Sequence, residues 1–176
     1  MPNPIPPDVN PAYGFLNTQI ALLGSRDPID VLAETSESLD DIVAQHSIET
    51  LRQRPTDEWW TGVEILAHLS DMEWIFGFRA RTILCDDKPR LPEIDQNAWV
   101  SVQRPDDWSP MQITEDFRTL RGVNLQMWKR MTESDLERTG EHVGAGITIS
   151  LGTLLRVHAG HDLRHLHQLR KTIGQK

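Results

Sequence analysis

Four stretches of this 176-residue chain repeat apolar residues at helical spacing, and none of comparable length alternates as a strand does. A Ser, Thr or Asp at a helix start is a typical N-cap, and a proline or a Glu shortly after it strengthens the signal. The expected helices begin at the caps Asp27, Thr61, Ser109 and Thr148. Only residues 142–149 suggest a short extended piece.

Four amphipathic helices around one core predict an all-α four-helix bundle, and the chain length fits one such domain over residues 27–176. Residues 1–26 begin with several prolines, which favour an extended arm. The connection between the second and third helices, residues 87–108, is too long for a tight turn. Its tryptophans Trp99 and Trp108 either pack the loop onto the bundle or form the rim of a pocket.

Charge and composition restrict the partners. The formal net charge of -8 disfavours a nucleic-acid backbone, and no apolar run reaches the length of a membrane span. The first residues lack the basic and apolar regions of a secretion signal. The single cysteine, Cys85, excludes an intramolecular disulfide, which suits a reducing compartment. We therefore expect a cytoplasmic protein with neither a nucleic-acid nor a membrane partner.

Histidines gather on the fourth predicted helix, where residues 158–170 hold four of the chain's 7. One face of that helix carries Leu154, His158, His161, His165 and Leu169. His161 and His165 are one turn apart, so their imidazoles can share an ion. His167 points to another face, where we expect it to be solvated.

A third ligand is expected from the apolar face of the second helix, where His68 stands between Ile65 and Met72. Three imidazoles leave coordination positions open, as in metal sites that bind substrate. The pattern H-D-x-x-H places Asp162 where zinc proteases carry a longer Glu, which argues against a protease. Zinc or nickel suits such a divalent transition-metal site best, while iron, cobalt and copper stay open.

Three stretches together resemble the DinB/YfiT-like family: "WWTGVEILAHLSDMEWIFGFRARTIL", "LRGVNLQMWKRMTESDLERTGEHVGAGITISLGTLL" and "HAGHDLRHLHQLRK". They cover most of residues 59–171. The resemblance implies a four-helix bundle in up-down-down-up order and a metal site formed by His68, His161 and His165. It also suggests a homodimer.

Other polar residues are candidates for roles around the metal. His158 could be a catalytic acid or base, a substitute ligand, or a partner of a ligand. Asp71 and Asp162 are phased to accept a hydrogen bond from a metal-bound histidine, or else are solvated acids paired with arginines. Arg121 could meet an anionic substrate group or lie on the surface. Asn124 lies on an apolar stripe and needs a buried partner, which a pocket would supply.

Characterised relatives suggest a metal-dependent S-transferase, which would join a small cytoplasmic thiol such as bacillithiol, mycothiol or glutathione to an electrophile. A metal-dependent hydrolase is the first alternative. A non-catalytic protein that binds a metal or small molecule is the second. The S-transferase is favoured because no carboxylate base is well phased for activating a water.

Overall fold

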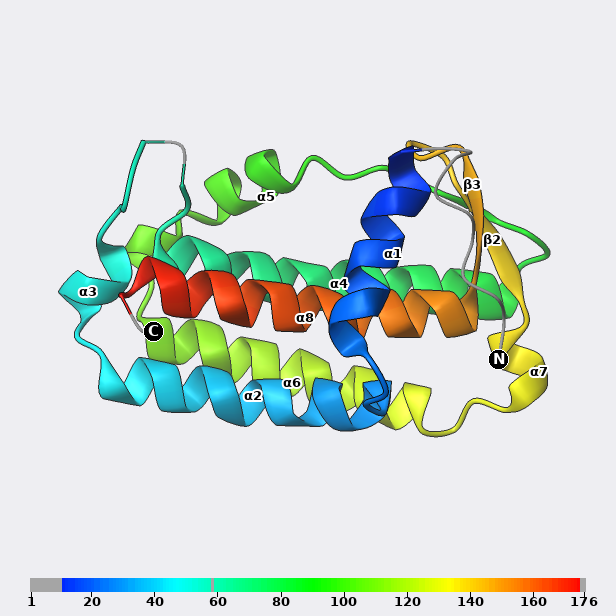
Figure 1. Ribbon diagram of the computed structural model, residues 1–176, viewed down its shortest axis with the longest axis horizontal. Coiled ribbons are helices and arrows are strands. Elements are labelled where there is room, and N and C mark those ends of the chain that lie inside the picture. The colour runs from blue at the N-terminus through cyan, green and yellow to red at the C-terminus, as the bar shows by residue number, and fades with distance from the viewer. Residues whose placement is uncertain (1–10, 58, 175–176) are drawn as a thin grey trace.

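The computed structural model describes residues 11–57 and 59–174. Its long helices lie side by side along the longest axis (Figure 1). These are α2 (Pro28–Gln45), α4 (Gly62–Cys85), α6 (Pro110–Trp128) and α8 (Leu151–Thr172). The shorter helical elements are α1 (Pro11–Leu23), α3 (Ile48–Arg52), α5 (Gln96–Gln103), η1 (Pro105–Asp107) and α7 (Glu133–Leu136). The strands are β1 (Arg90–Leu91), β2 (Thr139–His142) and β3 (Ile147–Ser150).

The long helices form the predicted four-helix bundle. Along the chain, α2 and α8 run in one direction while α4 and α6 run in the other, which is the up-down-down-up order (Figure 1). α4 packs between α6 and α8, and α2 packs between the same two helices on the other side. The predicted adjacency of the second and fourth long helices is therefore confirmed.

Local sequence sets where the helices begin. The Asp27 carboxylate accepts a hydrogen bond from the backbone N–H of Ile29 at 2.7 Å. Thr61 and Glu64 form a reciprocal capping box at the start of α4. The last helix differs from expectation: Ser150 caps it, because Thr148 belongs to strand β3.

The predicted extended arm over residues 1–26 is wrong for Pro11–Leu23, which form helix α1; residues 1–10 lie outside the described residues. Pro11 stands at the first turn, the one place where a helix tolerates proline. α1 packs across α8 (Figure 1). At their crossing a Cβ on Gly160 would lie 1.9 Å from the carbonyl oxygen of Gln19, so only glycine permits this approach.

The connection between α4 and α6 holds β1, α5 and η1, and it returns the chain to the end of the bundle where α4 began. β1 pairs in parallel with β2, and β2 pairs antiparallel with β3. The extended piece expected within residues 142–149 is thus the turn and second strand of a hairpin that covers one end of the bundle (Figure 1).

Two apolar clusters make up the core. On α8 the first cluster ends at Ala159 and the second begins at Leu166, so His161 and His165 lie between them. The polar centre of the molecule is therefore enclosed by apolar packing on both sides along the bundle axis. Among the helices of residues 11–57 and 59–174, none combines the length and apolar character that a membrane span requires.

Candidate metal centre

Three histidines from two helices converge inside the bundle. His68 comes from α4, while His161 and His165 lie one turn apart on α8; their exposed fractions are only 1%, 4% and 7%. One ring nitrogen from each lies within 4.8 Å of the others, and the Nε2 atoms of His68 and His161 are 3.1 Å apart. The sequence analysis selected these three residues, and the fold brings them together.

Burial holds these imidazoles in the neutral form that binds metals. It lowers the pKa of His68 to about 3 and that of His165 to about 4, and nearby positive charge adds to both shifts. Burial also lowers the pKa of His161 well below its usual value. Each ring therefore presents a lone pair at neutral pH rather than a proton.

The group fits a single transition-metal ion. Nitrogen atoms bound to one zinc ion at about 2.0–2.1 Å would lie roughly 3 to 4 Å from each other, a spacing that includes the observed 3.1 Å. The Nδ1 atoms of all three rings are buried and make no hydrogen bond to another described residue. Three imidazoles are a donor set that divalent transition metals accept.

Of the two roles expected for Asp162, the structure shows pairing with an arginine, although the pair is buried rather than solvated. The Oδ2 atom of Asp162 lies 2.7 Å from Nη2 of Arg121. Arg121 also donates from Nη2 to Glu73 at 2.6 Å and from Nη1 to the carbonyl oxygen of Leu32 at 2.6 Å. Arg121 is fully buried, so the expectation of a surface arginine is wrong. Its guanidinium is already paired with two carboxylates, which leaves the alternative role of a substrate contact without support.

His158 belongs to the same buried group. Its Nε2 atom donates to Oε1 of Glu73 at 2.7 Å, and its ring stacks on Phe76 at a centroid distance of 4.0 Å. Burial opposes the ionisation of Glu73, but His158 and Arg121 outweigh that cost and lower its pKa. The Glu73 carboxylate thus holds His158 one turn away from His161. His158 lines neither of the two cavities that border the histidine cluster.

The two remaining candidates for the pocket also lie elsewhere. Asn124 donates to Oε2 of Glu73 at 2.9 Å, so its buried partner is a carboxylate and not a substrate. Trp99 is 37% exposed and borders a shallow apolar groove with Trp74 and Phe78. We refer to Glu73, Arg121, Asn124, His158 and Asp162 as the buried polar network.

Asp71 also departs from its predicted role: its buried Oδ2 atom has no hydrogen-bond partner in the described part of the chain. Gln103 favours its ionised form only in part. Burial raises its pKa from 3.8 to about 6, so the ionised carboxylate destabilises the folded state.

We expect Asp71→Asn to raise the free energy of unfolding by about 1 kcal/mol at pH 7.5, after allowance for solvent screening of this partly hydrated group. In the wild type, the Asp71 carboxyl group keeps its proton to a higher pH in the folded state than in the unfolded chain. The wild type therefore loses stability as pH rises from about 4 through 6, and the gain from asparagine should vanish at pH 4. Urea unfolding of both proteins at the two pH values measures this, and an equal difference at both would contradict it.

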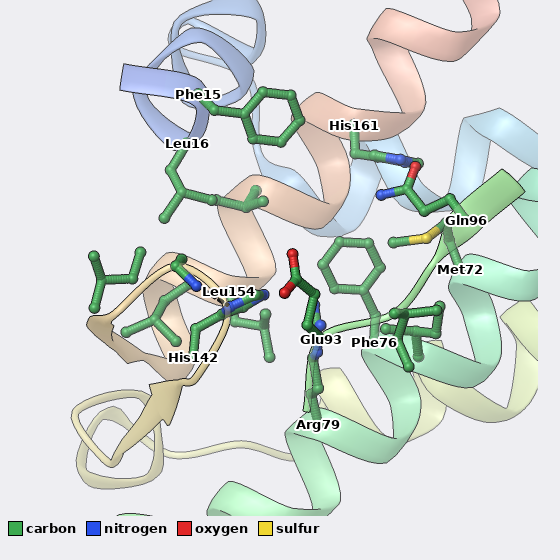
Figure 2. Close-up of a pocket in the computed structure, with 16 residues that line it drawn as sticks. Phe15, Leu16, Met72, Phe76, Arg79, Glu93, Gln96, His142, Leu154 and His161 are labelled. Atoms are coloured by element: carbon green, nitrogen blue, oxygen red, sulfur yellow. Dashed lines mark hydrogen bonds between the residues drawn. The ribbon is translucent and has the colours of Figure 1, made fainter. Parts of the chain in front are cut away.

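Two cavities meet at the histidine cluster. The first, here named the apolar cavity, has a volume of about 200 Å³ and walls that include Met72, Phe76, Leu154 and His161. Figure 2 shows Phe15, Gln96 and His161 toward one side of it, with the Glu93 carboxylate reaching into the middle and Arg79 and His142 nearby.

The second, here named the basic cavity, has a volume of about 600 Å³. Its walls include Trp59, Trp60, Arg164, His165, His167 and Lys171. Phe15, Gln96 and His161 line both cavities, so the histidine cluster lies where the two meet.

Sequence reasoning missed most of these cavity residues. Phe15 comes from α1, which was expected to be extended, and Glu93 and Gln96 come from the long connection. No periodicity marks such positions, because loop residues reach the site through tertiary packing alone. The one available signal was the length of the connection itself, which is typical of a functional segment.

The sequence profile of the DinB superfamily matches residues 32–169, and the chain belongs to this family. The solved structure of YfiT from Bacillus subtilis, described as an unusual four-helix bundle topology, superposes with a TM-score of 0.76 at 21% identity. The match covers 85% of this chain and 87% of that one. The family resemblance and the bundle topology inferred from sequence are therefore confirmed.

Curated relatives point to metal-dependent chemistry. A protein from Geobacillus thermodenitrificans named "Putative metal-dependent hydrolase" is 24% identical over 144 residues, covering 80% of this chain and 79% of the relative. A similarly named protein from Oceanobacillus iheyensis is 27% identical over 142 residues, or 79% and 75% of the two chains. YfiT of Bacillus subtilis, which bears the same name, is 22% identical over 149 residues, or 83% and 84%.

Proposed function

We propose that this protein is a metal-dependent S-transferase that joins a small cytoplasmic thiol to an electrophile. The supporting observation is the position of His161, which lines both cavities beside the two other histidines. A reaction between two molecules needs two binding spaces that meet at the reacting atoms. Hydrolysis needs only one such space and a water.

His68, His161 and His165 would hold the metal, with zinc or nickel the best-suited ions. When bound, such an ion supplies the Lewis acidity that keeps a thiol ionised at neutral pH. The walls formed by Met72, Phe76 and Leu154 would bind an apolar electrophile and exclude water from it. Trp60 lines the basic cavity, and its ring centroid lies 4.8 Å from that of His68. This contact restricts the motion of the His68 imidazole.

A metal-dependent hydrolase is the second candidate, supported by the names of the three curated relatives and by Glu93. The Glu93 carboxylate lines the same cavity as His161 and makes no ion pair within 4.0 Å in the described part of the chain. Arg79 and His142 line the same cavity, close enough to interact with the charge of Glu93. A carboxylate at that place could accept a proton from water.

Zinc- or nickel-loaded protein, incubated with glutathione and monochlorobimane, tests the proposal. We expect a fluorescent conjugate as the thiolate sulfur bonds to carbon, chloride leaves and the thiol proton passes to solvent. His165→Ala should abolish this turnover, while His46→Ala, altered at the C-terminal end of α2 and outside both cavities, should retain it. Thiol-independent cleavage of an ester or amide would instead support the hydrolase. Metal binding without turnover of any of these substrates would support a binding protein.

A further inference from the structure

The basic cavity has a charge opposite to that of the whole chain. Arg164, His167 and Lys171 line it, and no Asp or Glu is among its described lining residues. The full chain nevertheless carries a formal net charge of -8. A cavity lined by one sign of charge concentrates ligands of the other sign, so this space favours an anion.

Aromatic rings and a neutral amide position these cations without neutralising them. The Lys171 ammonium lies 4.7 Å from the ring centre of Trp59, and the Arg164 guanidinium lies 5.3 Å from that of Phe15. With the Gln19 side-chain amide turned so that both of its groups find partners, its oxygen accepts a hydrogen bond from Arg164 at 3.1 Å. In the described part of the chain neither cation has a carboxylate within 4.0 Å, so both charges are available to a ligand.

The spacing of the two cations restricts the ligand further. They are seven residues apart on α8, which corresponds to about 10 Å along the helix. His161 and His165 line the same cavity. Arg164 is near enough to the histidine cluster for its charge to lower the pKa of His68 and His165. His165 directly follows Arg164 in the sequence, so a ligand that bridges both cations would have its Arg164 end beside the histidines.

We propose that the basic cavity binds the thiol substrate, and that this thiol carries two carboxylates, one bound by Arg164 and the other by Lys171. This inference rests on the proposed S-transferase function and assigns the electrophile to the apolar cavity. Glutathione has this arrangement of charges. A thiol whose polar groups are neutral, such as mycothiol, lacks the groups that the two cations would bind.

Binding of S-methylglutathione, measured by calorimetry on zinc-loaded protein, tests the inference without requiring a thiolate or turnover. We expect Arg164→Gln and Lys171→Gln each to weaken the binding of S-methylglutathione about fivefold. The diethyl ester of S-methylglutathione should bind the wild type no more tightly than S-methylglutathione binds either variant. Lys129→Gln removes a surface cation just after the C-terminal end of α6 and should leave binding unchanged. Raising the salt from 50 to 500 mM should weaken binding to the wild type more than to either cavity variant.

The ester comparison needs no substitution, so a poorly folded variant cannot decide the result. Equal affinity for S-methylglutathione and its diethyl ester would overturn the inference. If glutathione and its ester are both conjugated at the same rate, the S-transferase stands and the charge assignment fails. If S-methylglutathione binds through Arg164 and Lys171 but glutathione is never conjugated, the anion site stands and the S-transferase fails.

Discussion

Replacing Arg121 with methionine should lower the free energy of unfolding by about 3–5 kcal/mol, a large part of the stability of an ordinary domain. Arg121 is 1% exposed and is the shared partner of Glu73 on α4, Asp162 on α8 and the Leu32 carbonyl on α2. Methionine fills much of the same space but leaves two carboxylates buried without their cation. Urea unfolding monitored by circular dichroism measures the loss.

A surface arginine on the same helix provides the control. Arg118 forms a bidentate pair with Asp40 at 2.9 and 3.1 Å, but both side chains are largely hydrated. We expect Arg118→Met to cost less than about 1 kcal/mol. Similar losses for the two variants would contradict the assignment of Arg121 as the centre of the buried polar network.

Zinc should stabilise the folded protein by about 4 kcal/mol when its free concentration is a thousand times the dissociation constant. The folded chain brings His68, His161 and His165 together, whereas the unfolded chain does not. His165→Ala should lose nearly all of this gain. Thermal unfolding with and without zinc, in a metal buffer, measures the difference for each protein.

His167→Ala is the matched control, since His167 is exposed and is absent from the cluster of converging ring nitrogens. It should keep the full zinc-dependent rise in melting temperature. An equal rise in His165→Ala would show that zinc binds elsewhere. The metal-free forms must be compared first, because removing a buried imidazole also changes packing.

Much of the fold could be predicted because the four long helices carry strong local signals. The capping box at Thr61 and Glu64 fixes the start of α4, and an apolar stripe fixes which face it buries. α1 was missed because the prolines before it favour an extended chain, while its helix is stabilised by packing on α8 through Gly160. That contact joins residues far apart in sequence, so no local pattern reveals it.

The metal-site histidines could be predicted because helix phasing alone places them on apolar faces. Phasing says which face a side chain occupies but not what it meets there. Asp162 was expected either to contact a histidine or to pair with an arginine in solvent, and it pairs with Arg121 from α6 in the buried interior. Glu73 was not among the residues selected from the sequence. It is the carboxylate that holds His158 and Asn124, because α6 and α8 both pack against α4 at that level.

The most direct test of the metal centre is the zinc content of the full-length protein after equilibrium dialysis, compared between wild type and His68→Ala. His68 is the only member of the cluster that lies on α4, so its removal tests whether the site joins the two helices. We predict about one zinc ion per wild-type chain and a loss of tight binding in His68→Ala, with circular dichroism showing an intact helical fold in both. One ion per chain bound equally tightly by His68→Ala, or none bound by the wild type at neutral pH, would contradict a three-histidine metal centre.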